Sequence, residues 1–252
     1  MIKRALFITI LLGVLSYSAL YVSDVSVSQW GETHITTIAE EWQIAPISGQ
    51  VVVAILDTGV DGDHVDLAGK VHSEANFSDS PTTDDLYGHG THCAGIITSI
   101  APDCVLLNVK VADDWGRCSG INVAQGIEWA VEHGASVVNV SLCVYSPCDE
   151  LEATVNYAWQ HGVVIIAAAC SLEKGRPITC YPALYEQCIA VTAVKDDGSP
   201  IPLMIYEDWI DFEAPGSGVY STLPDDNYGF KTGASPAVAY FSGQVASIMA
   251  GD

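Results

Sequence analysis

The sequence predicts an α/β fold with three layers, in which a mostly parallel central sheet is flanked by helices. Apolar runs rich in β-branched residues alternate with segments of helical spacing, an order typical of strand–helix–strand units. The runs are apolar at nearly every position, as expected for strands buried on both faces. The chain has 252 residues, 49% of them apolar, which suffices for one large core, so we expect one domain over residues 26–252.

Nine segments justify this fold class in chain order. The predicted strands are 51–56, 105–111, 136–142, 163–169 and 188–194, and the predicted helices are 89–100, 121–133, 149–161 and a small-residue helix that begins near Ser235 and runs to Met249. Ligands of such sheets bind at the carboxyl ends of the strands, so candidate catalytic residues are expected at those positions.

The amino-terminal segment differs from the rest of the chain. Lys3 and Arg4 precede an apolar run over 5–15 and a short polar stretch. This pattern predicts a secretory signal peptide over residues 1–22 and a secreted domain. An uncleaved signal anchor is the alternative, although the run is short for a membrane span. We expect no other membrane contact.

The charge balance is strongly acidic, with 31 acidic and nine basic residues and a formal net charge of −22. Nucleic acid would be repelled by such a surface, so it is excluded as a partner. We expect a monomer with a solvated acidic surface that acts on a peptide or protein.

Eight cysteines, an even number in a chain predicted to be exported, suggest disulfides. The 105 possible pairings leave connectivity open, although the short loop between Cys143 and Cys148 would make a local bridge easy to form. A zinc site is the rival interpretation, but no Cys-x-x-Cys pair occurs. The cysteines are Cys93, Cys104, Cys118, Cys143, Cys148, Cys170, Cys180 and Cys188.

Three residues stand out as candidates for catalysis. Asp57 ends a buried strand, where aspartate is often only a turn former. His89 opens a helix between two glycines, and Ser235 begins the last helix, where an ordinary helix cap is the alternative. The order Asp, His, Ser along one chain matches one known arrangement of a serine-hydrolase triad.

The motifs around these residues resemble those of the subtilases, a family of serine peptidases. The aspartate motif is similar to Asp57-Thr58-Gly59, the histidine motif is similar to 89–95 (HGTHCAG), and the similarity extends over 51–250. The resemblance implies a secreted serine endopeptidase that hydrolyses peptide bonds through Asp57, His89 and Ser235 and an acyl-enzyme. It implies no cofactor and no metal for the chemistry.

The serine motif of the family, Gly-Thr-Ser-x-Ala-x-Pro, can be aligned in two registers. One register places Thr232 at the nucleophile and needs a three-residue deletion. The other places Ser235 there, matches Gly233 and Ala237, and keeps the alignment from 214 onwards free of gaps. We therefore assign Ser235.

The resemblance also implies a substrate site and an oxyanion site. An extended substrate would lie along Ser141, Leu142 and Cys143 and along the edge near 117–120 as an added strand. The family's oxyanion asparagine is replaced by Ser171, a shorter donor. Losing that side-chain donor costs about 10²–10³ in rate, a magnitude known from subtilisin itself.

Other departures from the family concern length and calcium. The room before Asp57 is too short for a propeptide domain, and the chain is short after the serine helix. Asp66 matches one family calcium ligand, but a lone carboxylate is a poor site, so calcium binding is unsupported. These departures motivate an alternative function, a catalytically weak or inactive subtilase-fold peptide-binding module. An esterase is disfavoured because the Gly-x-Ser-x-Gly elbow is absent.

Overall fold

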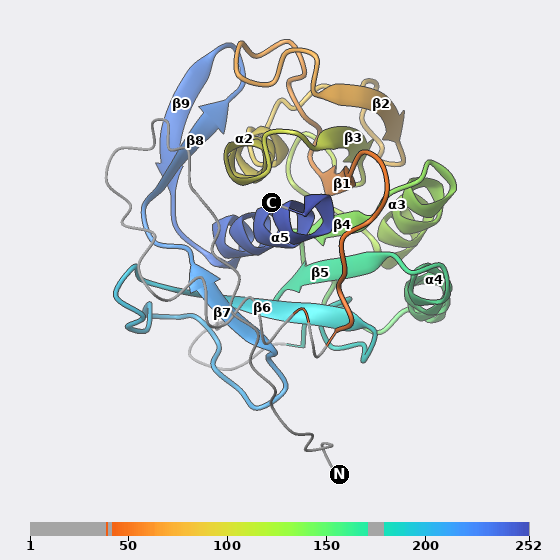
Figure 1. The fold of residues 1–252 in the computed structure, drawn as a ribbon, viewed down its shortest axis with the longest axis vertical. Coiled ribbons are helices and arrows are strands. Elements are labelled where there is room, and N and C mark those ends of the chain that lie inside the picture. Colours follow the sequence, from red (N-terminus) through yellow and green to blue (C-terminus); the bar gives the residue numbers. More distant parts are fainter. Residues whose placement is uncertain (1–38, 40–41, 171–178, 252) are drawn as a thin grey trace.

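The structure is a computed structural model that describes residues 39, 42–170 and 179–251. Its main feature is a sheet of seven strands in the order β2-β3-β1-β4-β5-β6-β7, in which every neighbouring pair is parallel (Figure 1). The elements are β1 (Val52–Asp57), β2 (Val71–Asn76), α2 (Gly90–Ile100), β3 (Val105–Lys110), α3 (Gly120–Glu132), β4 (Val137–Val140), α4 (Asp149–Gln160), β5 (Val164–Ala168), β6 (Cys188–Val194), β7 (Phe212–Pro215), β8 (Val219–Leu223), β9 (Asn227–Lys231) and α5 (Ala234–Ala250).

Helices cover both faces of this sheet, which confirms the predicted three-layer class. Alternate residues of β1 point to opposite faces, since Val53 and Ile55 pack with α2 and α5 whereas Ala54 and Leu56 pack with α3 and α4. Figure 1 shows these two helix pairs on opposite sides of the strands. The five predicted strands and four predicted helices all occur, with ends shifted by a few residues at most.

The strand order reverses at β1, whose neighbours are β3 and β4. Such a switch point leaves a crevice at the carboxyl ends of the adjacent strands. Asp57 is the last residue of β1, and Ser141 follows the last residue of β4. Both residues therefore lie at the edge where ligands of this fold class bind.

Four strands were not predicted from the sequence. β2 alternates between exposed and half-buried residues and carries His72 and Glu74, so it lacks the continuous apolar run of its neighbours. β7 has only four residues, and β8 and β9 form a separate antiparallel hairpin. Edge strands and hairpins need only one buried face, which is why apolar runs did not reveal them.

The β8–β9 hairpin is attached to α2. The Ser221 hydroxyl donates to the carbonyl of His92 over 2.9 Å, and the Thr222 hydroxyl donates to the carbonyl of Thr91 over 2.7 Å. A Cβ atom at Gly95 would lie 2.3 Å from Thr222 Oγ1, so only glycine permits this close approach. The hairpin thereby holds the start of α2, which carries the histidine motif.

The predicted signal peptide, residues 1–22, lies outside the described residues. Among residues 39, 42–170 and 179–251, no helix combines the length and apolar character that a bilayer crossing requires.

Candidate active site

Asp57 and His89 form a close pair at the carboxyl end of β1. Asp57 is fully buried, and its Oδ1 lies 2.7 Å from His89 Nδ1 and accepts a further 2.7 Å hydrogen bond from the Thr58 amide. His89 is half-buried and directly precedes α2. With Nδ1 bound to a carboxylate, the other ring nitrogen, Nε2, is left as the proton acceptor.

Close backbone packing holds this pair together. A Cβ atom at Gly90 would lie 2.0 Å from the Gly59 carbonyl oxygen and 3.0 Å from Asp57 Cβ. Gly59 has a φ of +109°, and a Cβ there would lie 2.4 Å from the Thr83 carbonyl oxygen. Gly59 and Gly90 therefore allow the backbone segments around the pair to pack closely.

Asp85 organises the same region and was not singled out from the sequence. This buried carboxylate accepts five hydrogen bonds. Its Oδ1 accepts from the Thr58 hydroxyl and the amides of Tyr87 and Gly88, and its Oδ2 accepts from the amide and hydroxyl of Thr91. Asp85 thus ties the turn after Asp57 to the first turn of α2. An aspartate three residues before a glycine–histidine pair was the available signal, because such residues cap turns.

Lys110, at the end of β3, is fully buried and braces the turn from the other side. Its Nζ donates to the carbonyls of Thr58 and Asp84 and forms a 2.8 Å ion pair with Asp114. A buried ammonium needs such partners. Because Thr58 follows Asp57 directly, Lys110 helps to fix the carboxylate.

The two histidines of the motif have opposite electrostatic environments. Burial lowers the pKa of His89, but the charge of Asp57 and its hydrogen bond outweigh burial, so the pKa is raised above 6.5. Burial lowers the pKa of His92 to about 4, and its Nε2 lies 3.1 Å from the Val219 carbonyl oxygen. His92 is therefore a neutral packing residue, and His89 is the histidine available for proton transfer.

Ser235 is the second residue of α5 and is half-buried. Its hydroxyl donates to the Ser141 carbonyl over 3.0 Å, and the Ser141 hydroxyl donates to the Ser235 carbonyl over 3.2 Å. Two further side chains continue this network, since Asn139 Nδ2 donates to the Ser141 hydroxyl and Ser242 donates to Asn139 Oδ1. The start of α5 is thereby fixed to the end of β4.

Cys93 connects the two halves of the site. Its sulfur lies within 4.8 Å of the ligand atoms of Asp57 and His89, and its other polar neighbour is the Ser141 side chain. Burial, followed by the charge of Asp57, raises the pKa of this thiol well above its usual value. Cys93 is thus an uncharged packing residue between the Asp57–His89 pair and the Ser141–Ser235 pair.

Thr232, the alternative nucleophile, has a different setting. It is exposed, precedes α5, and its hydroxyl oxygen accepts a 2.8 Å hydrogen bond from the Gly218 amide. Gly218 adjoins β8, so this bond closes the base of the hairpin. Thr232 has a structural contact there, whereas Ser235 is bonded to the end of β4.

The residues predicted to bind substrate follow β4. Ser141 is buried, and Leu142 and Cys143 are half-buried. The opposite edge near 117–120 is held by an ion pair between Arg117 and Asp113. Ser171, the predicted oxyanion donor, lies outside the described residues.

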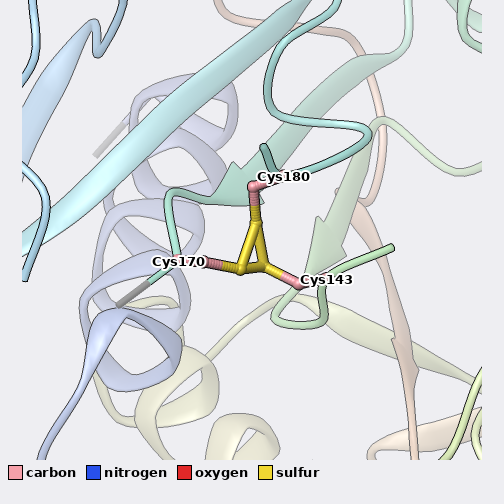
Figure 2. Close-up of side chains that lie close together, drawn as sticks. All are labelled: Cys143, Cys170 and Cys180. Carbon is pink, nitrogen blue, oxygen red and sulfur yellow. A yellow bond between two sulfur atoms is a disulfide. The ribbon is translucent and has the colours of Figure 1, made fainter. Parts of the chain in front are cut away.

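Three cysteines meet beside this segment, and the local Cys143–Cys148 bridge that the sequence left open does not form. The sulfur of Cys143 lies against the sulfurs of Cys170 and Cys180, whereas Cys148 is a free thiol. Figure 2 shows the three side chains pointing toward one another. Cys148 instead directly precedes α4, where its amide donates to the Tyr185 hydroxyl and its sulfur lies 3.4 Å from Glu150 Oε2.

Asp66, the one residue similar to a family calcium ligand, accepts a 2.6 Å hydrogen bond from the Tyr228 hydroxyl. In the part of the chain that the structure describes, Asp66 belongs to neither group of closely spaced metal-ligating side chains.

The fold and site together define a class of protein. A parallel sheet carries a buried Asp–His pair at its switch point, and a serine at the start of the last helix is bonded to the neighbouring strand. These features agree with an α/β serine hydrolase whose candidate catalytic residues follow the chain order Asp, His, Ser.

Comparisons with known proteins make the assignment more specific. Residues 48–252 match the model of the subtilase family, Peptidase_S8. Thermitase from Thermoactinomyces vulgaris is 38% identical over 84% of this chain and 78% of its own length, and subtilisin BL from Lederbergia lenta is 36% identical over 87% and 83%. The protease domain of PatA, solved as a mutant, has a TM-score of 0.69 at 28% identity over 77% of this chain and 78% of its own. The chain belongs to the subtilase family.

Proposed function

We propose that this chain is a serine endopeptidase that hydrolyses peptide bonds with Asp57, His89 and Ser235 as its triad. The 2.7 Å Asp57–His89 bond at the switch point carries the proposal, because it leaves the basic ring nitrogen free at the edge where Ser235 is held. Membership of the subtilase family supports the same assignment.

The chemistry follows from these positions. The Ser235 hydroxyl turns from the Ser141 carbonyl toward His89, which takes its proton as the oxygen attacks the peptide carbonyl. Asp57 stabilises the imidazolium and holds its tautomer. His89 then protonates the leaving amine, and a water deprotonated by the same histidine hydrolyses the acyl-enzyme. This chemistry requires no cofactor, and we propose that the domain acts after secretion.

Two groups would stabilise the oxyanion. The amide of Ser235 lies in the first turn of α5, where backbone donors have no partner within the helix. We assign the side-chain donor to Ser171. Because a serine reaches less far than an amide, Ser171→Asn should raise kcat by about 10-fold or more, and Ser171→Ala should lower it by less than the 10²–10³ cost of losing a well-placed donor. Peptide hydrolysis by the two variants measures this, and equal rates would remove Ser171 from the oxyanion site.

The decisive experiment is labelling of the folded domain with a fluorophosphonate probe. Activated serines react with such probes through their oxygen, so the wild type and Thr232→Ala should become labelled and Ser235→Ala should not. Circular dichroism of each variant confirms that it is folded. Labelling of Ser235→Ala would overturn the assignment of Ser235. Absence of labelling in folded wild-type protein would instead favour the peptide-binding module.

A further inference from the structure

The three-cysteine cluster, defined as Cys143, Cys170 and Cys180, cannot be fully disulfide-bonded. The sulfurs of all three residues lie within 4.8 Å of one another, yet a cysteine sulfur forms only one S–S bond. One disulfide therefore fits the cluster, and one thiol is left over. Five other cysteines are free thiols, so the odd member has no other partner among the described residues.

Backbone geometry separates the three possible pairs. The Cα–Cα distance is 5.3 Å for Cys143–Cys180, 6.0 Å for Cys170–Cys180 and 6.6 Å for Cys143–Cys170. Disulfides span about 4.4–6.8 Å and most often about 5.5–6 Å. The two pairs that include Cys180 lie close to the preferred distance, whereas the third lies near the upper limit. Cys180 is therefore the common partner.

Exposure distinguishes the two thiols that can remain. Cys170 is 8% exposed and Cys180 is fully buried, whereas Cys143 is half-buried. When Cys170 and Cys180 are joined, the accessible sulfur is the reduced one. When Cys143 and Cys180 are joined, the thiol is left at the buried Cys170.

We propose that the cluster is a covalent modification site, in which Cys180 always takes part in a single disulfide and Cys143 is the thiol that small disulfides modify. The two forms interconvert without net oxidation. The Cys143 thiolate attacks the Cys180 sulfur, a Cys143–Cys180 bond forms, the Cys170–Cys180 bond breaks, and Cys170 leaves as the thiolate and takes up a proton.

Modification is a second exchange of the same kind. The Cys143 thiolate attacks a low-molecular-weight disulfide, RSSR, giving a Cys143–SR mixed disulfide and one RSH. The same class of reagent, consumed with release of two RSH, forms the first disulfide from two thiols. Both steps therefore balance with a disulfide as the oxidant.

The surroundings favour a disulfide plus a neutral thiol over a bound metal ion. Cys170 and Cys180 pack with Ile205, and the sulfurs of Cys143 and Cys180 lie 3.8 Å and 3.2 Å from the Ala168 carbonyl oxygen. Three thiolates around a divalent ion would place a net negative charge in this apolar cluster, which is costly. A zinc or cadmium complex is thus the outcome that would contradict the proposal.

The site's effect on catalysis rests on the proposed function. Cys143 follows Leu142 and Ser141, the segment along which we propose that substrate lies, and Ser141 exchanges hydrogen bonds with Ser235. A group attached to Cys143 would occupy the substrate edge. Modification is therefore expected to raise KM and lower peptide hydrolysis while leaving the Asp57–His89 pair intact.

The disulfide pairing in the three-cysteine cluster can be determined without any activity measurement. The full chain, refolded with a glutathione redox pair, is quenched in acid to stop exchange, and its thiols and disulfides are then mapped by mass spectrometry. We expect Cys180 oxidised in every molecule, with the remaining cysteine found as a thiol at Cys143 or Cys170 or as a glutathione adduct on Cys143. A Cys143–Cys170 bond, or three reduced cysteines with or without added zinc, would overturn the proposal.

Modification is tested with 5,5′-dithiobis(2-nitrobenzoic acid) on the native protein. Exchange converts the form with a Cys143–Cys180 disulfide into the form with a Cys170–Cys180 disulfide as the reagent consumes the Cys143 thiol. We therefore expect close to one adduct per molecule on Cys143, with Cys170 and Cys180 joined. Peptide hydrolysis should fall at least 10-fold and return with a reducing thiol. Cys143→Ser should resist this loss, whereas Cys148→Ser, which removes a half-buried thiol outside the cluster, should behave as wild type.

The outcomes separate the two proposals. An untreated wild-type protein without hydrolysis would count against the proposed function, whereas the disulfide map would still decide the cluster. Failure of Cys143 to form an adduct, or an adduct that leaves hydrolysis unchanged in an active protein, would overturn the modification site.

Discussion

The two halves of the active site are held in different ways. On the side of α2, Asp57 and His89 are surrounded by the buried charges of Asp85 and Lys110 and by close backbone packing. On the side of α5, Ser235 depends on neutral hydroxyl and amide groups and lies near the three-cysteine cluster. The acid–base half is therefore fixed in advance, whereas the nucleophile has a hydroxyl that must turn before it reacts.

The largest expected effect tests the acid–base half. Asp57→Asn keeps the size of the side chain but removes the charge that orients and stabilises His89, so kcat should fall by about 10⁴-fold. Steady-state peptide hydrolysis measures this loss. Asp197→Asn, which changes an exposed carboxylate in a turn, is the matched control and should leave kcat unchanged. A loss below 10-fold in Asp57→Asn would show that His89 does not depend on this carboxylate.

Asp85→Asn tests whether the buried charge of Asp85 stabilises the Asp57–His89 side of the active site. In the variant, the side-chain amide nitrogen replaces one carboxylate oxygen. That nitrogen is a donor and cannot accept the hydrogen bonds that the oxygen accepts, so the free energy of unfolding should fall by about 2–4 kcal/mol. Urea denaturation measures this change. Asp63→Asn, at an exposed position near the same turn, should change stability little. Equal midpoints for the two variants would mean that the five hydrogen bonds of Asp85 add nothing to stability.

Ser141→Ala gives the corresponding test on the side of α5. The variant removes the hydroxyl that donates to Ser235 and leaves Asn139 Nδ2 buried without its acceptor, which costs about 1–3 kcal/mol. The carbonyl that holds the Ser235 hydroxyl remains, so fluorophosphonate labelling should stay within about 10-fold of wild type. A stability loss larger than that of Asp85→Asn would reverse the comparison between the halves.

The smallest expected effect concerns pH. His89 must be neutral to accept a proton, and its pKa is raised, so kcat/KM should rise with pH through a midpoint above 6.5. For stability the sign is opposite: the Asp57–His89 contribution is fully present below pH 6.5 and is lost as pH rises through the folded-state pKa. Rate and urea titrations measure both, and a kinetic midpoint at or below 6.5 would contradict the assigned environment.

The sequence allowed the buried sheet and the Asp57–His89 pair to be predicted because each depends on a local signal. Continuous apolar runs marked β1 and β3 to β6, and motif residues marked the pair. Asp85 was missed because its role depends on five donor groups from four residues. The three-cysteine cluster was missed because cysteine spacing leaves the pairing open, whereas the ends of β4 and β5 bring Cys143 and Cys170 together in the folded chain.

The bond between Ser235 and Ser141 joins positions 94 residues apart, and α5 packs against α2 and strands β4 to β7. Helix α5 follows all of these elements in the sequence, so during synthesis the ribosome releases it after them. Contacts of such long range form late and slowly in folding. A partly synthesised or partly folded chain would therefore hold its Asp57–His89 pair without a nucleophile in place. On the proposed triad, the nucleophile would therefore come into place only once helix α5 had docked.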